Sequence, residues 1–300
     1  MEVDRTLLGV APSLELVVSC RREVGAEIER IWENVFDWEH LPVLHEMYFD
    51  KVELLEIGNE GWRVALTKQP GTPDRRMILE LKADRKKRRY RVKITAGDGA
   101  GSEIWTMMTP LGPQRTAIEV QYYLPERYAE KRNELAEKYR RSCEQLWDQD
   151  EAMMIRREAM VARATAPTLP SPASGGGSGR GSSTPVSLGL LAGLRQRLPL
   201  LVEFDGEEFR IVELEDESLI AHSTTCPHWL GPLAEAVPKN GVLRCPWHGY
   251  CFDLRTGHSA DGRGYQLAPA PQVAVDPVTS EVILTGGSPA AAGRGSATER

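Results

Sequence analysis

Two cysteine and histidine pairs in the last third of the chain have the types and spacing of metal ligands. One residue separates Cys226 from His228, two separate Cys245 from His248, and sixteen lie between the pairs. Each pair offers one thiolate and one imidazole, as a [2Fe–2S] cluster requires when two histidines replace two cysteines on one iron. The cysteines would bind one iron and the histidines the other. The pattern predicts a carrier of single electrons, with a reduction potential between roughly −150 and +300 mV.

A single tetrahedral Zn²⁺ is the alternative, because two cysteines and two histidines also suit that metal. Zinc fingers usually pair cysteine with cysteine and histidine with histidine, whereas each loop here mixes the two types. The spacing therefore favours the iron–sulfur cluster. The other three of the five cysteines are Cys20, Cys143 and Cys251. We interpret them as small buried side chains in a reducing compartment, because an odd count at these spacings is unlike a disulfide framework.

The two loops resemble those of Rieske ferredoxins and Rieske oxygenases, and the resemblance covers essentially all of residues 200–285. It is carried by Cys226-Pro-His228-Trp-Leu-Gly231-Pro-Leu233 and by Cys245-Pro-Trp-His248-Gly249-Tyr-Cys-Phe252-Asp253-Leu-Arg-Thr-Gly257. Quinol-oxidising Rieske proteins add a disulfide between the loops. This chain has Trp247 where their second-loop cysteine would fall, so it is more similar to the ferredoxins and oxygenases.

Two of the six histidines, His40 and His45, lie close together near the N-terminus. On an unbroken helix, residues five apart point about 140° away from each other and could not share a metal. Pro42 is expected to interrupt the helix after His40 and to let the next turn re-aim His45. Two histidines and one carboxylate are the usual protein ligands of a mononuclear non-haem Fe(II). The segment therefore predicts an iron site that needs one acidic residue from elsewhere.

The missing carboxylate is expected on a long helix predicted over residues 126–162. Apolar residues recur along it at steps of three and four, and Asp150 falls on their side. An acid among core residues is costly unless it is paired or bound to a metal. Asp150 is therefore the predicted third ligand, with Asp148 and Glu151 as substitutes. The other interpretation is that both histidines are ordinary helix-end side chains and that the acid pairs locally.

This segment resembles the iron-binding segment of the Rieske non-haem iron oxygenases. The motif Asn34-x-x-Asp37-x-x-His40-x-x-x-x-His45 carries the resemblance, together with Gln149-Asp150-Glu151 on the last helix. It implies that Asp37 holds the ring of His40 and accepts a hydrogen bond from a histidine of the cluster, which would bridge the two metal centres. It also implies a homotrimer. Two features depart from the family: the order of the domains is reversed, and the catalytic half is short.

The elements that must position these residues form an α+β chain of two domains. Over residues 10–162, a first strand and a helix precede six alternating segments and the long helix. The strands are expected at 14–19, 51–57, 61–67, 77–82, 89–94, 103–108 and 116–123, and the first helix at 24–35. This pattern predicts a helix-grip (START/SRPBCC-like) domain, in which an antiparallel sheet wraps the last helix around a cavity.

The second domain is expected at 197–285 as a small all-β unit, because short apolar segments alternate there with glycine turns. Residues 163–196 and 286–300 are rich in small residues and predict a flexible linker and a disordered tail. The net charge of −6, with both signs interspersed, gives no reason to expect nucleic acid as a partner. Neither a secretory signal nor an apolar stretch long enough for a bilayer is visible, which predicts a cytoplasmic protein with no membrane partner.

Together these features predict an oxygenase in which the cluster feeds electrons to a mononuclear Fe(II). The iron would activate O₂ as a mono- or dioxygenase does, and would hydroxylate or dealkylate a small organic substrate in the helix-grip cavity. Electrons from NAD(P)H would arrive through a separate ferredoxin, a flavin reductase or both, because the chain has no glycine-rich nucleotide fingerprint. The basic stretch 82–93 is interpreted as a solvated hairpin or as the docking site of such a partner. The alternative function is a Rieske ferredoxin-like electron carrier, fused to a ligand-binding helix-grip domain without a second metal.

Overall fold

The computed structural model describes residues 8–68, 75–165 and 184–286. The chain divides into two compact units, residues 1–165 and 166–300. Each unit has its own hydrophobic core.

The N-terminal unit is built on one seven-stranded antiparallel sheet with the order β1-β7-β6-β5-β4-β3-β2. Consecutive strands from β2 to β7 are neighbours, and β1 pairs with the last strand. The strands are β1 (Leu14–Val24), β2 (Phe49–Gly58), β3 (Gly61–Lys68), β4 (Arg76–Asp84), β5 (Arg89–Gly97), β6 (Glu103–Gly112) and β7 (Arg115–Pro125). This sheet and the long helix that follows it confirm the expected helix-grip architecture.

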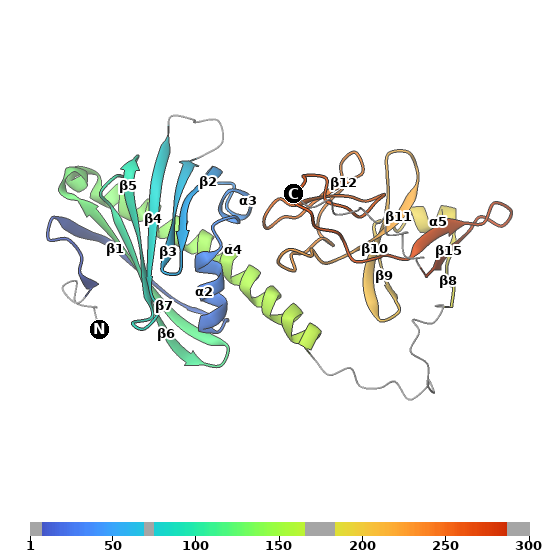
Figure 1. Ribbon diagram of the computed structural model, residues 1–300, viewed down its shortest axis with the longest axis horizontal. Coiled ribbons are helices and arrows are strands. Elements are labelled where there is room, and N and C mark those ends of the chain that lie inside the picture. The colour runs from blue at the N-terminus through green and yellow to red at the C-terminus, as the bar shows by residue number, and fades with distance from the viewer. Residues whose placement is uncertain (1–7, 69–74, 166–183, 287–300) are drawn as a thin grey trace, which may run out of the picture. The chain divides into compact units, whose positions relative to one another are not determined.

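The helices of this unit cover one face of the sheet (Figure 1). Helices α2 (Ile28–Phe36) and α3 (Leu41–Leu44) connect β1 to β2, and the short 3-10 helix η1 (Glu126–Lys131) leads into α4 (Arg132–Thr165). The core between sheet and helices is formed by alternate strand residues and by apolar residues of α2 and α4. Its buried members include Val64, Leu81, Ile118, Val120, Ile31, Trp32, Val35, Cys143, Trp147 and Met154.

The chain breaks at a different residue from the one expected. Helix α2 ends at Phe36, and Asp37 leaves the helical region with φ −84° and ψ 89°. Pro42 instead lies in the first turn of α3, where its missing N–H has no helical partner to lose. The end of α2 is held by the Trp62 indole, which donates to the carbonyl oxygen of Val35 at 2.9 Å. The expectation that Pro42 interrupts a helix after His40 was therefore wrong. The helix instead breaks at Asp37, before both histidines.

The C-terminal unit consists of three small antiparallel sheets with the orders β11-β10-β9, β12-β13 and β14-β15-β8. Their strands are β8 (Val186–Leu190), β9 (Leu200–Phe204), β10 (Glu207–Glu213), β11 (Leu219–Ser223), β12 (Val242–Arg244), β13 (Cys251–Asp253), β14 (Gln272–Val275) and β15 (Glu281–Thr285). One short helix, α5 (Leu191–Arg195), follows β8. The expected small all-β domain is confirmed.

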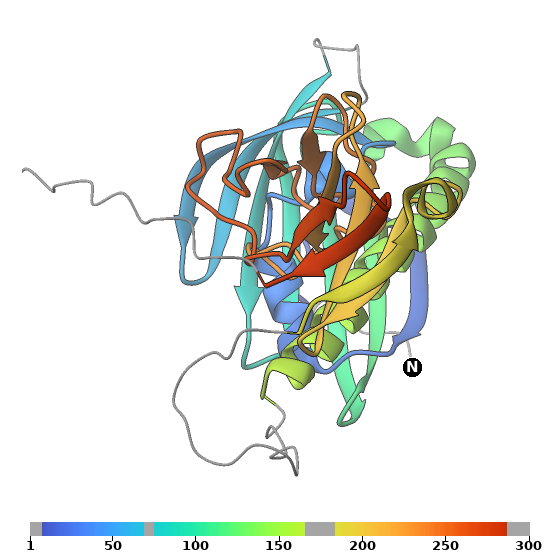
Figure 2. The same ribbon diagram turned by 90° about the vertical axis from the view of Figure 1, so that its right-hand side faces the viewer.

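The expected linker over 163–196 was too long at both ends. Helix α4 continues to Thr165, and residues 186–195 form β8 and α5. Strand β8 pairs with β15, more than ninety residues further along, as the neighbouring yellow and red strands show (Figure 2). A five-residue strand that pairs with such a distant partner has little local signal. The remainder of that stretch, 166–183, and the expected tail beyond residue 286 lie outside the described residues.

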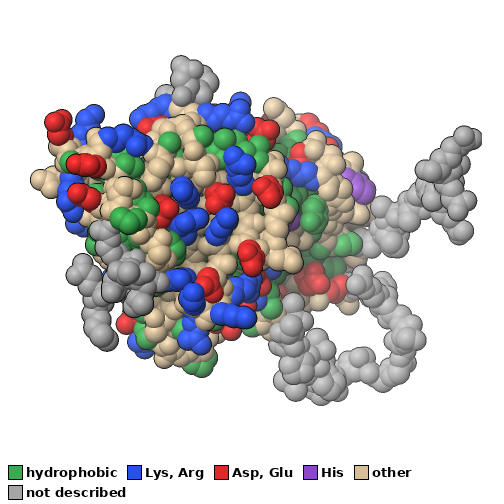
Figure 3. Space-filling model, turned by 60° about the vertical axis from the view of Figure 1, so that its left-hand side comes forward, with side chains coloured by type: hydrophobic (Ala, Val, Ile, Leu, Met, Phe, Trp, Pro, Cys, Tyr) green, Lys and Arg blue, Asp and Glu red, His purple; other side chains and the backbone are tan. Residues whose placement is uncertain are grey.

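The basic stretch 82–93 forms the hairpin of β4 and β5, and acidic residues accompany its cations. Arg91 lies 3.6 Å from Glu80 and 3.5 Å from Glu103, and Lys87 lies 3.5 Å from Asp84. Basic and acidic side chains are also mixed on the face drawn in Figure 3. Among the helices of the described ranges, none has the length and apolarity that crossing a membrane requires.

Gly97 is the last residue of β5 and pairs with Met77 of β4. Its φ is +82°, and a Cβ there would lie 2.0 Å from the carbonyl oxygen of Arg76. We expect Gly97→Ala to lower the free energy of unfolding by about 2–4 kcal/mol, because backbone strain and a backbone clash add. Chemical denaturation followed by far-ultraviolet circular dichroism measures this change. Gly58→Ala is the matched control, since nothing lies within 4 Å of a Cβ there; equal losses in both variants would contradict the argument.

Candidate metal sites

His40, His45 and Asp150 converge in the interior of the N-terminal unit. His40 and His45 flank α3, whereas Asp150 lies on α4. The Nε2 atoms of His40 and His45 lie 3.4 and 3.2 Å from the same carboxylate oxygen of Asp150, Oδ1. Both histidines are almost completely buried, at 3% and 2% exposure. In the described part of the chain, no other group of three histidine, cysteine or acidic residues brings its donor atoms within 4.8 Å of one another.

The opposite nitrogen of each imidazole ring faces an oxygen atom. Asp37 Oδ2 lies 3.3 Å from Nδ1 of His40, and Gln149 Oε1 lies 2.8 Å from Nδ1 of His45. An amide oxygen can only accept, so Nδ1 of His45 donates to Gln149. A neutral His45 ring then presents the lone pair of Nε2 to Asp150. Partners of this kind hold metal-binding histidines in one tautomer and orientation.

The carboxylate of Asp150 is ionised despite its burial. Burial by itself raises the pKa of Asp150, but the hydrogen bond with His45 and the charges of His45 and His40 outweigh it. Asn34 adds a hydrogen bond from Nδ2 to Oδ1 at 3.2 Å. The net effect holds the pKa of Asp150 below its ordinary value. Two imidazole nitrogens thus face a negatively charged oxygen.

The two acidic neighbours that were considered as substitutes have other partners. Asp148 is exposed and pairs with Arg22 at 2.9 Å. Glu151 also pairs with Arg22 and accepts a hydrogen bond from the backbone N–H of Gly25 at 2.7 Å. Both carboxylates point away from the histidines because the helix turns about 100° per residue.

The geometry of the three donors fits one metal ion. Imidazole and carboxylate ligands at about 2.0–2.2 Å from a metal lie about 3 Å from each other when they occupy adjacent positions. The two measured nitrogen to oxygen distances are close to that spacing. Two histidines and one carboxylate on one side of an ion leave other positions open, as in non-haem Fe(II) sites.

Sequence reasoning assigned no role to the contact between Gln149 and His45. The motif Gln149-Asp150-Glu151 includes this residue, and its position beside Asp150 on the helix is the signal that the sequence offers for the contact. Asn34 was likewise noted without its hydrogen bond to Asp150. Both contacts join residues more than one hundred positions apart.

In the C-terminal unit, each cysteine and histidine pair lies in a loop that closes on itself. The backbone N–H of Cys226 donates to Gly231, and that of Leu230 donates back to Cys226, at 2.9 and 3.0 Å. The second loop joins β12 to β13, where the N–H of Cys245 donates to Tyr250 and that of Gly249 donates to Cys245, at 2.8 and 3.0 Å. These backbone bonds give each loop a closed shape.

The donor atoms of the two loops are arranged as two pairs. Cys226 and Cys245 are each 1% exposed, and their sulfur atoms share a hydrogen bond. That bond lowers the pKa of Cys245 to about 6, and backbone N–H groups of Trp247 and His248 also lower it. The imidazole rings of His228 and His248 lie 4.6 Å apart and are perpendicular to each other. The two thiols are thus paired with each other, and so are the two imidazoles. A cluster of two irons bridged by sulfides requires this arrangement, because the cysteines bind one iron and the histidines the other.

Gly231 allows the two loops to approach. A Cβ at this position would lie 2.8 Å from the sulfur of Cys245 and 3.3 Å from the ring of Trp247. On the histidine side, Tyr250 stacks on His228 with ring centroids 4.1 Å apart, and Arg263 lies 4.2 Å above the Tyr250 ring. Both loops are therefore packed closely around the four donors. The sulfur atoms contact each other and the imidazole rings contact each other, which favours the cluster over a single tetrahedral zinc ion.

Comparison with known proteins identifies the C-terminal unit. Residues 186–270 match the family described as the Rieske [2Fe-2S] domain. Apoptosis-inducing factor 3 of Mus musculus and of Homo sapiens is 41% identical over 51 residues, which is 17% of this chain and only 8% of those proteins. This chain thus spans a small part of the length of the curated relatives that it matches.

Solved structures are similar to parts of the chain. The ferredoxin of carbazole 1,9a-dioxygenase from Nocardioides aromaticivorans IC177 is 30% identical, with 35% of this chain and 100% of that chain covered and a TM-score of 0.30. Norcoclaurine synthase from Thalictrum flavum is 20% identical (48% and 88% covered, TM-score 0.39). The ZhuI aromatase/cyclase from Streptomyces sp. R1128 is 16% identical (48% and 96% covered, TM-score 0.40).

The family match and the geometry of the two loops concern the same segment. A Rieske domain implies electron transfer through a [2Fe–2S] cluster. The C-terminal unit of this chain is a Rieske [2Fe–2S] domain.

Proposed function

We propose that this protein is a Rieske-type oxygenase that activates O₂ at a mononuclear Fe(II) in its N-terminal unit. The observation that carries the proposal is the buried convergence of two imidazole nitrogens on one carboxylate oxygen, in a chain that also contains a Rieske domain. The ligands of the mononuclear iron would be His40, His45 and Asp150. The ligands of the cluster would be Cys226, His228, Cys245 and His248.

The N-terminal site needs a cation between its donors. Because Nδ1 of His45 donates to Gln149, a neutral ring has only a lone pair at Nε2, and this lone pair faces Asp150 at 3.2 Å. Two lone pairs at this distance repel unless a proton or a metal ion lies between them. Two neutral imidazoles and a carboxylate suit Fe(II), which supplies O₂ activation when it is bound.

The remaining residues orient the site and control its surroundings. Asp37 and Gln149 hold the rings of His40 and His45 from the opposite side. By the family resemblance, Asp37 would also link electron transfer to the iron. Burial keeps the Tyr90 hydroxyl protonated by raising its pKa, and Tyr90 lies close enough to Asp150 to be affected by its charge. The Tyr90 hydroxyl shares a hydrogen bond with Thr106.

The partners follow from the chemistry. The Rieske cluster carries one electron at a time, so a ferredoxin, a flavin reductase or both must deliver electrons from NAD(P)H in single steps. O₂ and a small organic substrate would enter the N-terminal unit, and the product would be hydroxylated or dealkylated. The same family resemblance makes a homotrimer the proposed assembly.

A second function, a Rieske ferredoxin-like carrier with a metal-free helix-grip unit, is favoured by one observation. The same three residues can be satisfied by a proton, since a protonated His45 donates to Asp150 and lowers the pKa of that acid. In this case the helix-grip unit would bind an apolar ligand and hold no iron. The two functions therefore differ in whether a proton or a metal lies between the donors.

Iron content separates these functions. We expect the purified protein to contain about three irons per chain, since a cluster holds two and the mononuclear site one. His45→Ala is expected to remove about one iron and leave the cluster signal in electron paramagnetic resonance, whereas Cys245→Ser is expected to remove about two. Metal analysis of each variant measures these losses.

His258→Ala is the control for this experiment, because His258 lies outside both proposed ligand sets. It should retain all the iron of the unaltered protein. Two irons in the unaltered protein, with no change in His45→Ala, would refute the oxygenase and support the carrier.

The orienting role of Gln149 gives a separate prediction. We expect Gln149→Ala to weaken Fe(II) binding about 10–100-fold, because His45 loses the partner that fixes its tautomer. Competition with a ferrous chelator measures the affinity, and the visible absorbance of the cluster should not change.

Gln145→Ala is the matched control for the role of Gln149. Gln145 lies on the same helix and bonds to the Tyr48 hydroxyl instead of a histidine. An equal loss of Fe(II) affinity in both variants would show that the effect comes from the helix and not from the orientation of His45.

A further inference from the structure

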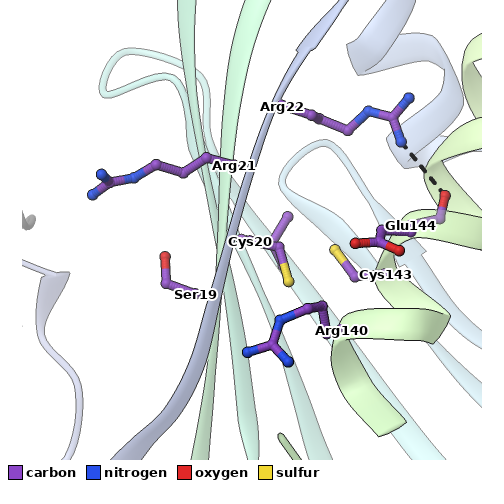
Figure 4. A pocket seen from close by; sticks show the side chains of 8 residues that line it. Ser19, Cys20, Arg21, Arg22, Arg140, Cys143 and Glu144 are labelled. Atoms are coloured by element: carbon purple, nitrogen blue, oxygen red, sulfur yellow. Dashed lines mark hydrogen bonds between the residues drawn. The ribbon is translucent and has the colours of Figure 1, made fainter. Parts of the chain in front are cut away.

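A pocket of about 210 Å³ lies between β1 and α4, at a place that neither proposed metal site uses. Its lining residues are Ser19, Cys20, Arg21, Arg22, Val120, Arg140, Cys143 and Glu144. Two of them are cysteines from elements far apart in the sequence. The sulfur atoms of Cys20 and Cys143 point toward each other from the strand and the helix (Figure 4).

The two thiols are in direct contact but have different environments. A hydrogen bond joins their side chains, and Cys20 is half-buried whereas Cys143 is 3% exposed. The bond to Cys143 lowers the pKa of Cys20 against the effect of burial, and the charge of Arg140 lowers it further while Glu144 raises it. The same bond and burial raise the pKa of Cys143. Cys20 is therefore the thiol that ionises first, and it is the more exposed of the two.

Cys143 is held next to Cys20, where it could react with an oxidised Cys20 sulfur. Tyr122 shares a hydrogen bond with Cys143, which lines the same pocket as Cys20. Cys251 provides a contrast, because its thiol donates to the carbonyl oxygen of Gly249 at 3.3 Å and burial raises its pKa. A thiol that is oxidised to an intramolecular disulfide needs a lowered pKa, access and a neighbouring second thiol. Among the three cysteines outside the cluster ligands, the pair in the pocket combines these features, whereas Cys251 does not.

We propose that Cys20 and Cys143 are a peroxide-reactive pair that closes to a disulfide between β1 and α4. The Cys20 thiolate attacks one oxygen of hydrogen peroxide, the O–O bond breaks, and Cys20 becomes a sulfenic acid while the leaving hydroxide takes a proton and forms water. Cys143 then attacks that sulfur, the S–O bond breaks, and its proton leaves with the hydroxide as a second water. The two thiols lose two electrons in total, and one peroxide is reduced to two waters.

The proposal replaces the interpretation of these two cysteines as inert buried side chains. The disulfide would tie the first strand to the helix that carries Asp150, seven positions beyond Cys143. It is independent of the proposed function, because peroxide is an ordinary cellular oxidant and the pair needs no iron.

Peptide mapping tests the pair in the full-length protein with its cluster. The protein is treated with hydrogen peroxide, unreacted thiols are alkylated, and the chain is digested without reduction. The expected result is one linked peptide that joins Cys20 to Cys143 and disappears after treatment with dithiothreitol. The proposal fails if Cys20 and Cys143 are both recovered alkylated after this treatment.

Three variants assign the roles within the pair. Cys143→Ser should lose the linked peptide and leave Cys20 as a sulfenic acid that dimedone traps, whereas Cys20→Ser should lose both products. Cys251→Ser is the matched control and should form the same linked peptide as the unaltered protein. Dimedone on Cys143 instead of Cys20, or loss of the link in Cys251→Ser, would overturn the assignment. Mapping of the unaltered protein decides the existence of the pair even if a variant does not fold.

Discussion

The carboxylate of Asp150 is ionised inside the N-terminal unit, and the arrangement around it depends on that charge. A buried anion is stable only when hydrogen bonds or cations surround it. Asn34 of α2 donates to it at 3.2 Å, and the histidines on either side of α3 face it at 3.2–3.4 Å, where a proton or a metal ion between nitrogen and oxygen supplies the counter-charge. The contacts join α2 and α3 to one oxygen atom of α4. The position of α4 over the sheet therefore determines both the apolar core and the polar site.

The C-terminal unit is organised by close approach of its two loops rather than by a buried charge. Each loop closes through its own backbone hydrogen bonds, and Gly231 leaves room for the sulfur of Cys245. Backbone N–H groups next to the ligands point at the sulfur atoms, which favours the thiolate form. Phe209 and Ile211 belong to a core formed mainly by the strands of the two three-stranded sheets. Local contacts thus prepare this unit for its cluster.

The fold of the N-terminal unit does not by itself specify a reaction. A sheet that grips a long helix can enclose many ligands, so the activity depends on the residues placed inside it. In this chain α4 contributes Cys143 to the pocket beside β1, and it contributes Gln149 and Asp150 to the site around His45. One helix therefore carries both the proposed iron ligand and the proposed redox pair, and its packing against β1 affects both.

Short-range properties of the sequence were sufficient for much of this description. Alternation of apolar residues predicted all seven strands of the large sheet, and the mixed spacing of cysteine and histidine predicted the Rieske domain. Helical periodicity also indicated that Asp150 faces inward whereas Asp148 faces solvent. These features depend on neighbouring residues, because backbone geometry repeats over two to four positions.

Only the tertiary structure decided which distant residues meet. The end of α2 at Asp37, the pairing of β8 with β15, the bond from His45 to Gln149 and the contact between Cys20 and Cys143 all depend on packing across the fold. No local pattern encodes such contacts. In the first unit they depend on how the sheet packs against α4, and in the second unit on the pairing of its first strand, β8, with β15.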